Sequence, residues 1–191
     1  MNKDMNIIKF LQMVCRKPFF NSVIDYGCGG SPKCLPLDIP LKVGIEANPE
    51  KAIQASSKLP VYVKDLEALY HLDGDNIIKE YHFDLGLCID VFEHFTPEFI
   101  GVSQEDCFIT NSADTTIFFI PEGKIGYNPE NDKGYDLHKT FWDEEALTNY
   151  FKFSCVFKWV DYHGNGKNAF LVFAGKQAHY LLNSAYILIG E

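Results

Sequence analysis

One stretch of the chain, Ser22-Val-Ile-Asp-Tyr-Gly-Cys-Gly-Gly-Ser31, is the most informative about its fold. A run of apolar and β-prone residues ends in an acid, Asp25, and glycines follow at once. This pattern is typical of a buried parallel strand that ends in a tight turn, where the backbone can approach a ligand closely. A second strand-like run, Leu41–Glu46, also ends in an acid, 21 residues after Asp25. In nucleotide-binding α/β folds, an acid at about this spacing accepts hydrogen bonds from ribose hydroxyls.

The residue after this stretch argues against a diphosphate ligand. The dinucleotide fingerprint requires glycines in the order G-x-G-x-x-G, and Pro32 stands where the third belongs. A diphosphate at a helix N-terminus also needs free backbone N–H groups, which proline lacks. The carboxylate of Asp25 would repel a diphosphate, whereas it suits a ligand that carries positive charge.

Length and composition predict one soluble globular domain. With 191 residues, of which 47% are hydrophobic and 23% charged, a single domain spanning 1–191 is expected. Within it we expect an N-terminal helix at about 4–15, a core at about 20–176 and a C-terminal tail at 177–191. The formal net charge of −9 argues against a nucleic-acid partner, because phosphate neutralisation needs clustered Lys and Arg.

Cysteine usage and the chain ends predict a reduced, cytoplasmic protein. None of the six cysteines forms a C-x-x-C pair, and no signal peptide precedes them. Most of them are expected to pack as small apolar groups. The apolar tail at 180–189 is too short and too interrupted to span a bilayer, so no membrane partner is expected. It should dock on the body as a helix or strand, or contact a partner.

Strand and helix patterns alternate along the chain. Asn48-Pro49-Glu50 and Thr96-Pro97-Glu98 each supply a cap, a proline and an acid, so a helix is expected to start at both places, the first running to about Leu59. The last two strands should form a hairpin, because Asn165-Gly166 lies between them. The expected strands lie at about 22–27, 42–47, 61–65, 83–90, 115–120, 155–162 and 169–174, with further helices near 66–80 and 142–152.

Motif and topology together resemble the class I (Rossmann-like) S-adenosylmethionine (SAM)-dependent methyltransferases. Their first motif reads acid-x-Gly-x-Gly-x-Gly, and Asp25-Tyr-Gly-Cys-Gly-Gly-Ser31 matches it except at the final Ser. The resemblance implies a three-layer α/β/α sandwich around a seven-stranded, mostly parallel sheet with an antiparallel C-terminal hairpin strand. It also implies SAM as the methyl donor, with S-adenosylhomocysteine (SAH) as the product.

Four successive expected strands end in an acid, namely Asp25, Glu46, Asp65 and Asp90. Open α/β sheets bind ligands at the carboxyl ends of their strands, so these carboxylates should converge on one edge. A negative edge suits a ligand with an ammonium, a sulfonium and hydroxyl donors. It suits a phosphate-bearing nucleotide badly.

The resemblance implies how this edge would hold the donor. Gly27 and Gly29 would let the backbone approach the amino acid portion of SAM, and Asp25 would hold its ammonium, directly or through water. Glu46 would accept from both ribose hydroxyls, because one carboxylate can accept from two donors, and Ala47 would give apolar contact. Taken alone, glycines after a strand often form only a turn, but the spacing of Glu46 makes a functional role the favoured interpretation.

The adenine and the reacting methyl have their own candidates. Asp65 resembles the family's acid that accepts from the adenine amine, with Leu66 lining the ring, although Asp65 is equally suited to cap a helix. The run Asp90-Val-Phe-Glu-His94 resembles the family's fourth motif, which places Asp90 and Val91 near the transferred methyl. The Glu and His of this run are expected to brace the following loop.

A long loop, 121–142, follows the fifth expected strand and contains Tyr127, Tyr135 and His138. Loops of about this length in compact domains are functional or disordered, and we expect this one to cover the acceptor site. Methyl transfer is an in-line displacement that needs alignment and exclusion of water, and a general base only for some acceptors. His138 is the candidate for that base, the alternative being a surface histidine. The expected acceptor is a small molecule.

A metal-dependent enzyme is a competing interpretation. Asp90, Glu93 and His94 have the i, i+3, i+4 spacing of one helical face, and His138 would complete a set of ligands for a divalent metal. The arrangement is similar to that of metal-dependent methyltransferases that act on the terminal ribose of small RNAs. Their pattern begins with Glu rather than Asp, and the main expectation includes no metal.

Further protein classes fit the residues less well. DNA base methyltransferases carry an Asn/Asp-Pro-Pro-aromatic motif that is absent here. A non-catalytic module that binds SAM or a partner would not need acids at its strand ends. An NAD-dependent oxidoreductase is disfavoured by Pro32. The sequence indicates neither the acceptor atom nor the oligomeric state.

Overall fold

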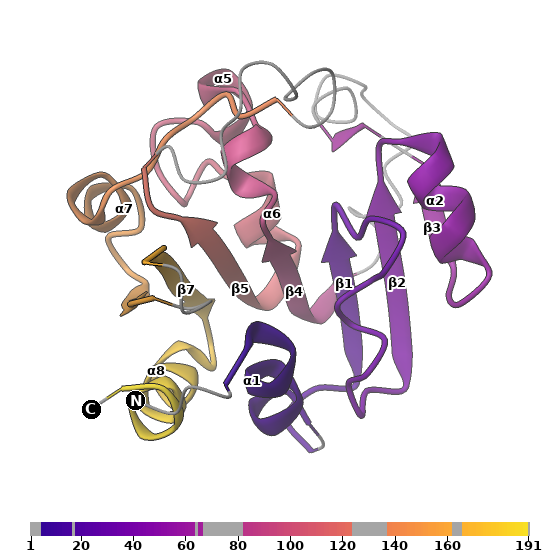
Figure 1. The fold of residues 1–191 in the computed structure, drawn as a ribbon, viewed down its shortest axis with the longest axis horizontal. Helices are drawn as coiled ribbons and strands as arrows, with labels where there is room; N and C mark the ends of the chain where they lie inside the picture. The colour runs from indigo at the N-terminus through magenta and orange to yellow at the C-terminus, as the bar shows by residue number, and fades with distance from the viewer. Residues whose placement is uncertain are drawn as a thin grey trace.

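A seven-stranded sheet forms the centre of the protein (Figure 1). The computed structural model describes residues 5–16, 18–63, 65–66, 82–123, 137–161 and 166–190. The strand order is β3-β2-β1-β4-β5-β7-β6. Neighbouring strands are parallel except around β7, which runs antiparallel to both β5 and β6. The strands are β1 (Ser22–Tyr26), β2 (Leu41–Glu46), β3 (Val61–Val63), β4 (Phe83–Ile89), β5 (Ala113–Pro121), β6 (Cys155–Trp159) and β7 (Ala169–Gly175).

Helices cover both faces of the sheet, because successive strand side chains point to opposite faces and both sets are apolar. Phe119 and the other side chains on its face of the sheet pack against α1 (Ile7–Val14) and α8 (Ala178–Leu188). Phe118 and the other side chains on the opposite face pack against α5 (Pro97–Ile100), α6 (Phe108–Asn111) and α7 (Glu144–Tyr150). The predicted fold class, a three-layer sandwich with a mostly parallel sheet, is confirmed.

The helix α2 (Pro49–Ser56) begins where its capping signal predicts. The Asn48 side-chain oxygen accepts from the backbone N–H groups of Glu50 (3.0 Å) and Lys51 (3.3 Å), which would otherwise lack partners. The helix α5 also begins at its predicted proline. It lasts only one turn, because Gly101 follows it with φ 75°.

Several elements differ from expectation or fall outside the described residues. The apolar tail forms α8, and two short elements were not predicted, the 3₁₀ turn η1 (Phe92–His94) and α6. The expected helix at 66–80 lies almost wholly outside the described residues, as does Asn165 of the expected hairpin turn. All six cysteines are unbridged and five of them are buried, as expected for small apolar groups.

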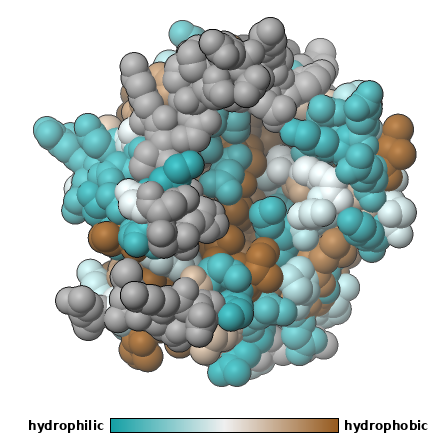
Figure 2. All heavy atoms as spheres, in the orientation of Figure 1, coloured by the Kyte–Doolittle hydropathy of each residue, from teal (hydrophilic) through white to brown (hydrophobic). Residues whose placement is uncertain are grey.

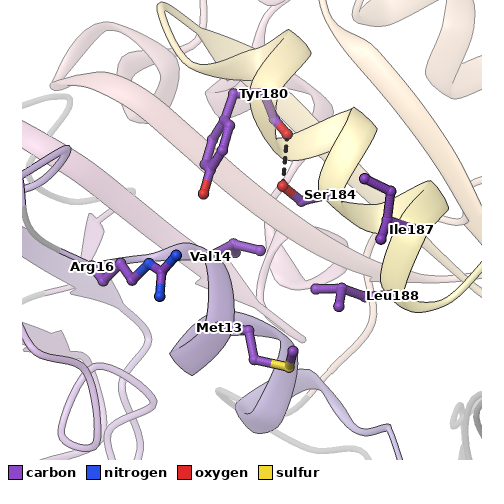
Figure 3. Close-up of a pocket in the computed structure, with 7 residues that line it drawn as sticks. All are labelled: Met13, Val14, Arg16, Tyr180, Ser184, Ile187 and Leu188. Carbon is purple, nitrogen blue, oxygen red and sulfur yellow. Dashed lines mark hydrogen bonds between the residues drawn. The ribbon is translucent and has the colours of Figure 1, made fainter.

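Among the residues that Figure 2 colours, hydrophilic ones cover much of the visible face, and hydrophobic ones lie in the hollow at its centre and in smaller patches around it. In the described part of the chain, no helix has both the length and the apolar character needed to cross a membrane. Figure 3 shows a groove between α1 and α8. Its lining residues are Met13, Val14, Arg16, Tyr180, Ser184, Ile187 and Leu188. None of them belongs to the strand ends where the sequence predicts a site.

Candidate functional site

The turn after β1 lies against the end of β4. Gly27 has φ 59°, a conformation that L side chains rarely adopt. A Cβ atom at Gly27 would lie 2.5 Å from Cγ2 of Val91, so only glycine allows this approach. Gly29 also has a positive φ, of 58°, but a Cβ built on it meets no heavy atom of the described residues within 4 Å. The turn is therefore packed at Gly27 and open at Gly29.

Glu46 lies across this turn from the end of β2. One carboxylate oxygen accepts from the Gly29 N–H at 2.7 Å and the other from the Asn48 N–H at 2.8 Å. The residue is only 7% exposed, so these bonds fix its orientation. Each carboxylate oxygen has acceptor capacity for more than one donor. Ala47 is half-buried beside it. The glycine turn and the acid at the end of the second strand, which the sequence singled out separately, are thus in direct contact.

Asp25 lies beneath the turn and is 1% exposed. Its Oδ2 atom accepts from the Cys34 N–H at 3.0 Å, which ties β1 to the connection that follows the turn. Loss of solvent on burial raises the pKa of Asp25 to about 6, against the opposing effect of backbone hydrogen bonds from Cys34 and Lys33. The structure therefore assigns Asp25 a bracing role in the loop. Its predicted contact with an ammonium stays a prediction.

The two residues predicted for the adenine, Asp65 and Leu66, follow β3, which ends at Val63 and not at Asp65 as predicted. Asp65 is exposed, whereas Leu66 is 5% exposed and joins the core that includes Ile45 and Val91. The chain that follows Leu66 lies outside the described residues. The adenine contacts of both side chains remain predictions.

Asp90 directly follows β4 and has a strained backbone conformation. Its φ is 55°, in the left-handed region that few non-glycine residues occupy, and its N–H donates to the Phe119 carbonyl at 3.0 Å. Strain of this kind persists where the surroundings impose it, and it is frequent at functional sites. Asp90 is exposed at the strand end, and Val91 after it is 9% exposed. These positions agree with the edge that the sequence predicts for the ligand.

The turn η1 and the segment 137–142 bring together Glu93, His94 and His138. One ligand atom from each lies within 4.8 Å of the others. The His94 and His138 ring centroids are 4.6 Å apart, and His94 Nε2 lies 4.0 Å from Glu93 Oε1. The sequence grouped Asp90 with these three residues, but Asp90 is not in the group that the structure gathers among its described residues.

Glu93 is the unusual member of this group, which we call the Glu93 cluster. It is 3% exposed, and its Oε2 atom is buried with no hydrogen-bond partner among the described residues. Burial, and then the negative charge of Asp90, raise the pKa of Glu93 to about 8. A buried carboxylate needs a proton or a cation beside it. The sequence assigned this residue to loop bracing, because nothing in the local pattern indicates its burial.

The hydrogen bond of His94 sets which ring nitrogen faces Glu93. His94 Nδ1 lies 3.2 Å from the Leu137 carbonyl, which can only accept, so Nδ1 carries the proton. In the neutral ring, Nε2 then presents its lone pair near Glu93. Histidines that ligate metals commonly donate their other N–H to a carbonyl in this way. Tyr127 and Tyr135 of the same loop lie outside the described residues.

Solved structures of methyltransferases are similar to this chain over most of its length. The N-terminal domain of EvdMO1, solved with SAH bound, superposes with a TM-score of 0.62 at 11% identity, over 87% of this chain and 79% of that one. The chain has the Rossmann-like methyltransferase fold. By sequence alone, neither a protein-family model nor a curated protein matches the chain.

Two further structures show how varied the methyltransferases of this fold are. The methyltransferase domain of bacterial CtHen1-C has a TM-score of 0.59 at 14% identity, over 92% of this chain and 100% of that one. Magnesium protoporphyrin IX methyltransferase from Synechocystis PCC 6803, with SAH bound, has a TM-score of 0.56 at 15% identity, over 89% and 80%. The methyltransferase fold therefore does not specify the acceptor.

Proposed function

We propose that the protein is a SAM-dependent methyltransferase. The supporting observation is the carboxylate of Glu46, held across the glycine turn with acceptor capacity remaining on both oxygens. A ribose diol, which has two hydroxyl donors, suits this carboxylate. The open space at Gly29 leaves room for the rest of the ligand. Similar folds solved with SAH bound support the choice of SAM over other nucleosides.

The roles along the edge follow the order of the strands. Gly27 and Gly29 give backbone access to the amino acid portion, and Asp25 braces their loop and provides negative charge beneath it. At the other end, Asp65 accepts from the adenine amine and Leu66 contacts the ring. Ala47, Asp90 and Val91 complete the wall near the ribose and the methyl.

The reaction is a displacement at the methyl carbon. A lone pair of the acceptor forms the new bond to carbon while the carbon–sulfur bond breaks, and SAH leaves with that electron pair. The chain's contribution is alignment and exclusion of water. A hydroxyl acceptor must also lose its proton, and in a site without a metal His138 is the candidate to accept it.

The Glu93 cluster favours a second feature, a divalent cation at the acceptor side. One carboxylate and two imidazoles form a donor set that suits a divalent transition metal, and the buried Oε2 atom of Glu93 fits a cation neighbour. A bound cation would lower the pKa of a coordinated hydroxyl. Glu93, His94 and His138 would hold it. The sequence favoured a site without metal, and the convergence of these three side chains supports the metal alternative.

A cation at this place favours acceptors with a hydroxyl group, whose pKa it would lower. A small molecule is our first candidate, because the net charge of −9 disfavours a polyanionic partner. The terminal ribose of a small RNA is the second, since the run Asp90-Val-Phe-Glu-His94 is similar to the pattern of that class except at Asp90, and one similar solved structure is that of the small RNA methyltransferase HEN1.

Calorimetry with SAM and with NAD tests the donor. We expect micromolar affinity for SAM and no heat with NAD. Glu46→Ala should abolish SAM binding, whereas Glu105→Ala, which removes an exposed carboxylate, should leave it unchanged. A wild-type protein that binds no SAM would refute the proposal.

Labelled SAM tests the acceptor and the cation together. Methyl transfer should be measured to pooled small hydroxyl compounds and, separately, to short RNAs with free 3′ ends. We expect chelator to stop the transfer and Mn²⁺ to restore it, and we expect His138→Ala to lose it. Transfer that withstands chelation would leave His138 as a general base and remove the cation.

A further inference from the structure

The Glu93 cluster depends on contact between two segments that are distant in the sequence. Glu93 and His94 lie on η1, whereas His138 belongs to the segment 137–142. Two backbone bonds join the segments, since the Glu93 carbonyl accepts from the Lys139 N–H at 2.8 Å and from the Thr140 N–H at 3.0 Å. His138 immediately precedes these two residues, so its position follows from how the segment docks on η1.

The side chain of Thr140 adds a second connection at the same place. Its hydroxyl lies 3.3 Å from the Glu93 carbonyl and 3.5 Å from the Phe92 carbonyl, either of which can accept a hydrogen bond from it. The same hydroxyl oxygen accepts from the indole N–H of Trp142 at 3.0 Å. The Thr140 hydroxyl therefore connects the backbone of η1 to the indole.

Trp142 anchors this connection in the core. It is 7% exposed, and its ring lies 5.3 Å from the ring of Phe92, which is fully buried on η1. The Trp142 carbonyl also accepts from the Gly123 N–H at 2.6 Å, which ties the segment to the end of β5. Trp142 thus touches η1 through its ring and Gly123, two residues after β5, through its backbone.

We propose that Thr140 and Trp142 are positioning residues that hold His138 at ligand distance from Glu93 and His94. This inference rests on the cation proposed above, and neither residue is a ligand of it. The connection is a chain of hydrogen bonds, in which the indole N–H donates to the hydroxyl and the hydroxyl donates to the carbonyl groups of η1. Without it, the backbone bonds remain, but the segment can shift on η1 and displace the His138 ring.

Titration with Mn²⁺, followed by electron paramagnetic resonance of the free ion, tests the proposal without an activity measurement. Thr140→Val removes the hydroxyl and keeps the shape of the side chain. We expect it to weaken Mn²⁺ binding about tenfold, the lower end of the range for residues that orient metal ligands. Thr140→Ser retains the hydroxyl and should bind within about twofold of the wild type.

Thr148→Val is the matched control, because it also removes a threonine hydroxyl that donates to a backbone carbonyl, that of Glu144 at 2.7 Å. It should not change Mn²⁺ affinity. In a His138→Ala background, Thr140→Val should have no further effect, because its action passes through His138. Trp142→Phe, which keeps a ring against Phe92 but removes the N–H, gives the same test if Thr140→Val does not fold.

The outcomes separate the two proposals. A wild-type protein that binds no Mn²⁺ overturns the cation and, with it, this inference. If the wild type binds Mn²⁺ and a folded Thr140→Val variant binds it equally tightly, the positioning role alone is overturned. A lower melting temperature with unchanged Mn²⁺ affinity would also overturn it, because Thr140 would then serve only the fold.

Discussion

Gly27 is the position in the first turn that cannot carry a side chain. A methyl group there would meet Val91 at 2.5 Å and would occupy a left-handed backbone. We expect Gly27→Ala to lower the free energy of unfolding by about 3 kcal/mol, from overpacking and backbone strain together, and to abolish SAM binding. Urea unfolding and calorimetry measure these effects.

Gly166→Ala separates the two causes. Gly166 has φ 77°, but a Cβ atom there meets nothing within 4 Å among the described residues. In this control only the strain of the left-handed backbone should act, and it should lower the free energy of unfolding by about 1 kcal/mol. Equal losses in both variants would mean that the contact with Val91 is unimportant.

Asp25 should make stability depend on pH in an identifiable way. Its pKa is about 6 in the folded protein and near 3.8 when unfolded, so the folded state holds the proton more tightly. The contribution of Asp25 to stability is therefore complete below about pH 4 and is lost as the pH rises through about 6. The loss should approach about 3 kcal/mol by pH 7.

Asp25→Asn removes this titration and keeps a side-chain acceptor for the Cys34 N–H. Urea unfolding of both proteins between about pH 4 and pH 7 gives the measurement, and taking their difference cancels all other groups. The free energy of unfolding of the variant should rise relative to that of the wild type as the pH rises. A difference that does not change with pH would show that Asp25 titrates normally.

Among the elements, α2 links stability to the donor site through its N-cap. Asn48 caps the helix with its side chain and donates its own N–H to Glu46. We expect Asn48→Ala to cost about 1 kcal/mol of unfolding free energy, because the helix loses its side-chain cap. We also expect weaker SAM binding, because without the cap residue 48 no longer holds its backbone N–H in place against Glu46. Thermal unfolding and calorimetry report the two effects.

Asn6→Ala is the control for this prediction. Asn6 caps α1 in the same manner, since its side chain accepts from the Lys9 N–H at 3.0 Å, and α1 contributes no residue to the site. The same loss of about 1 kcal/mol is expected, with SAM affinity unchanged. If both variants weakened SAM binding equally, global destabilisation would be the cause.

Elements with strong local signals were the ones that could be predicted from the sequence. The glycine turn, the acid that ends β2 and the cap at Asn48 are each contained in a few adjacent residues, and the structure has all three. The 3₁₀ turn η1 and the four-residue α6 are too short to produce a periodic pattern, so they were missed.

The Glu93 cluster could be predicted only in part. The spacing of Glu93 and His94 is visible in the sequence, and His138 was singled out for its place in the long loop. Their convergence depends on docking of the segment 137–142 on η1, which involves residues more than 40 positions apart. The burial of Glu93 and the positive φ of Asp90 likewise arise from the fold, and no local pattern indicates them.

At the scale of the whole molecule, α8 is a part of the core. Leu181 is fully buried against the sheet, whereas Ile187 on the same helix is 81% exposed. We expect Leu181→Ala to cost about 3 kcal/mol of unfolding free energy and Ile187→Ala less than about 0.5 kcal/mol. Urea unfolding measures both, and a neutral Leu181→Ala would mean that α8 is not docked.

The place of β7 in the sheet has a consequence for how the protein emerges from the ribosome. β7 is the last strand to be synthesised, yet it fills an internal position between β5 and β6. Until Gly175 has left the exit tunnel, β5 exposes an unpaired edge, and β6 cannot join the sheet. The sheet can therefore close only after β7 has emerged, and a nascent chain stalled before Ala169 should be open to proteases and chaperones.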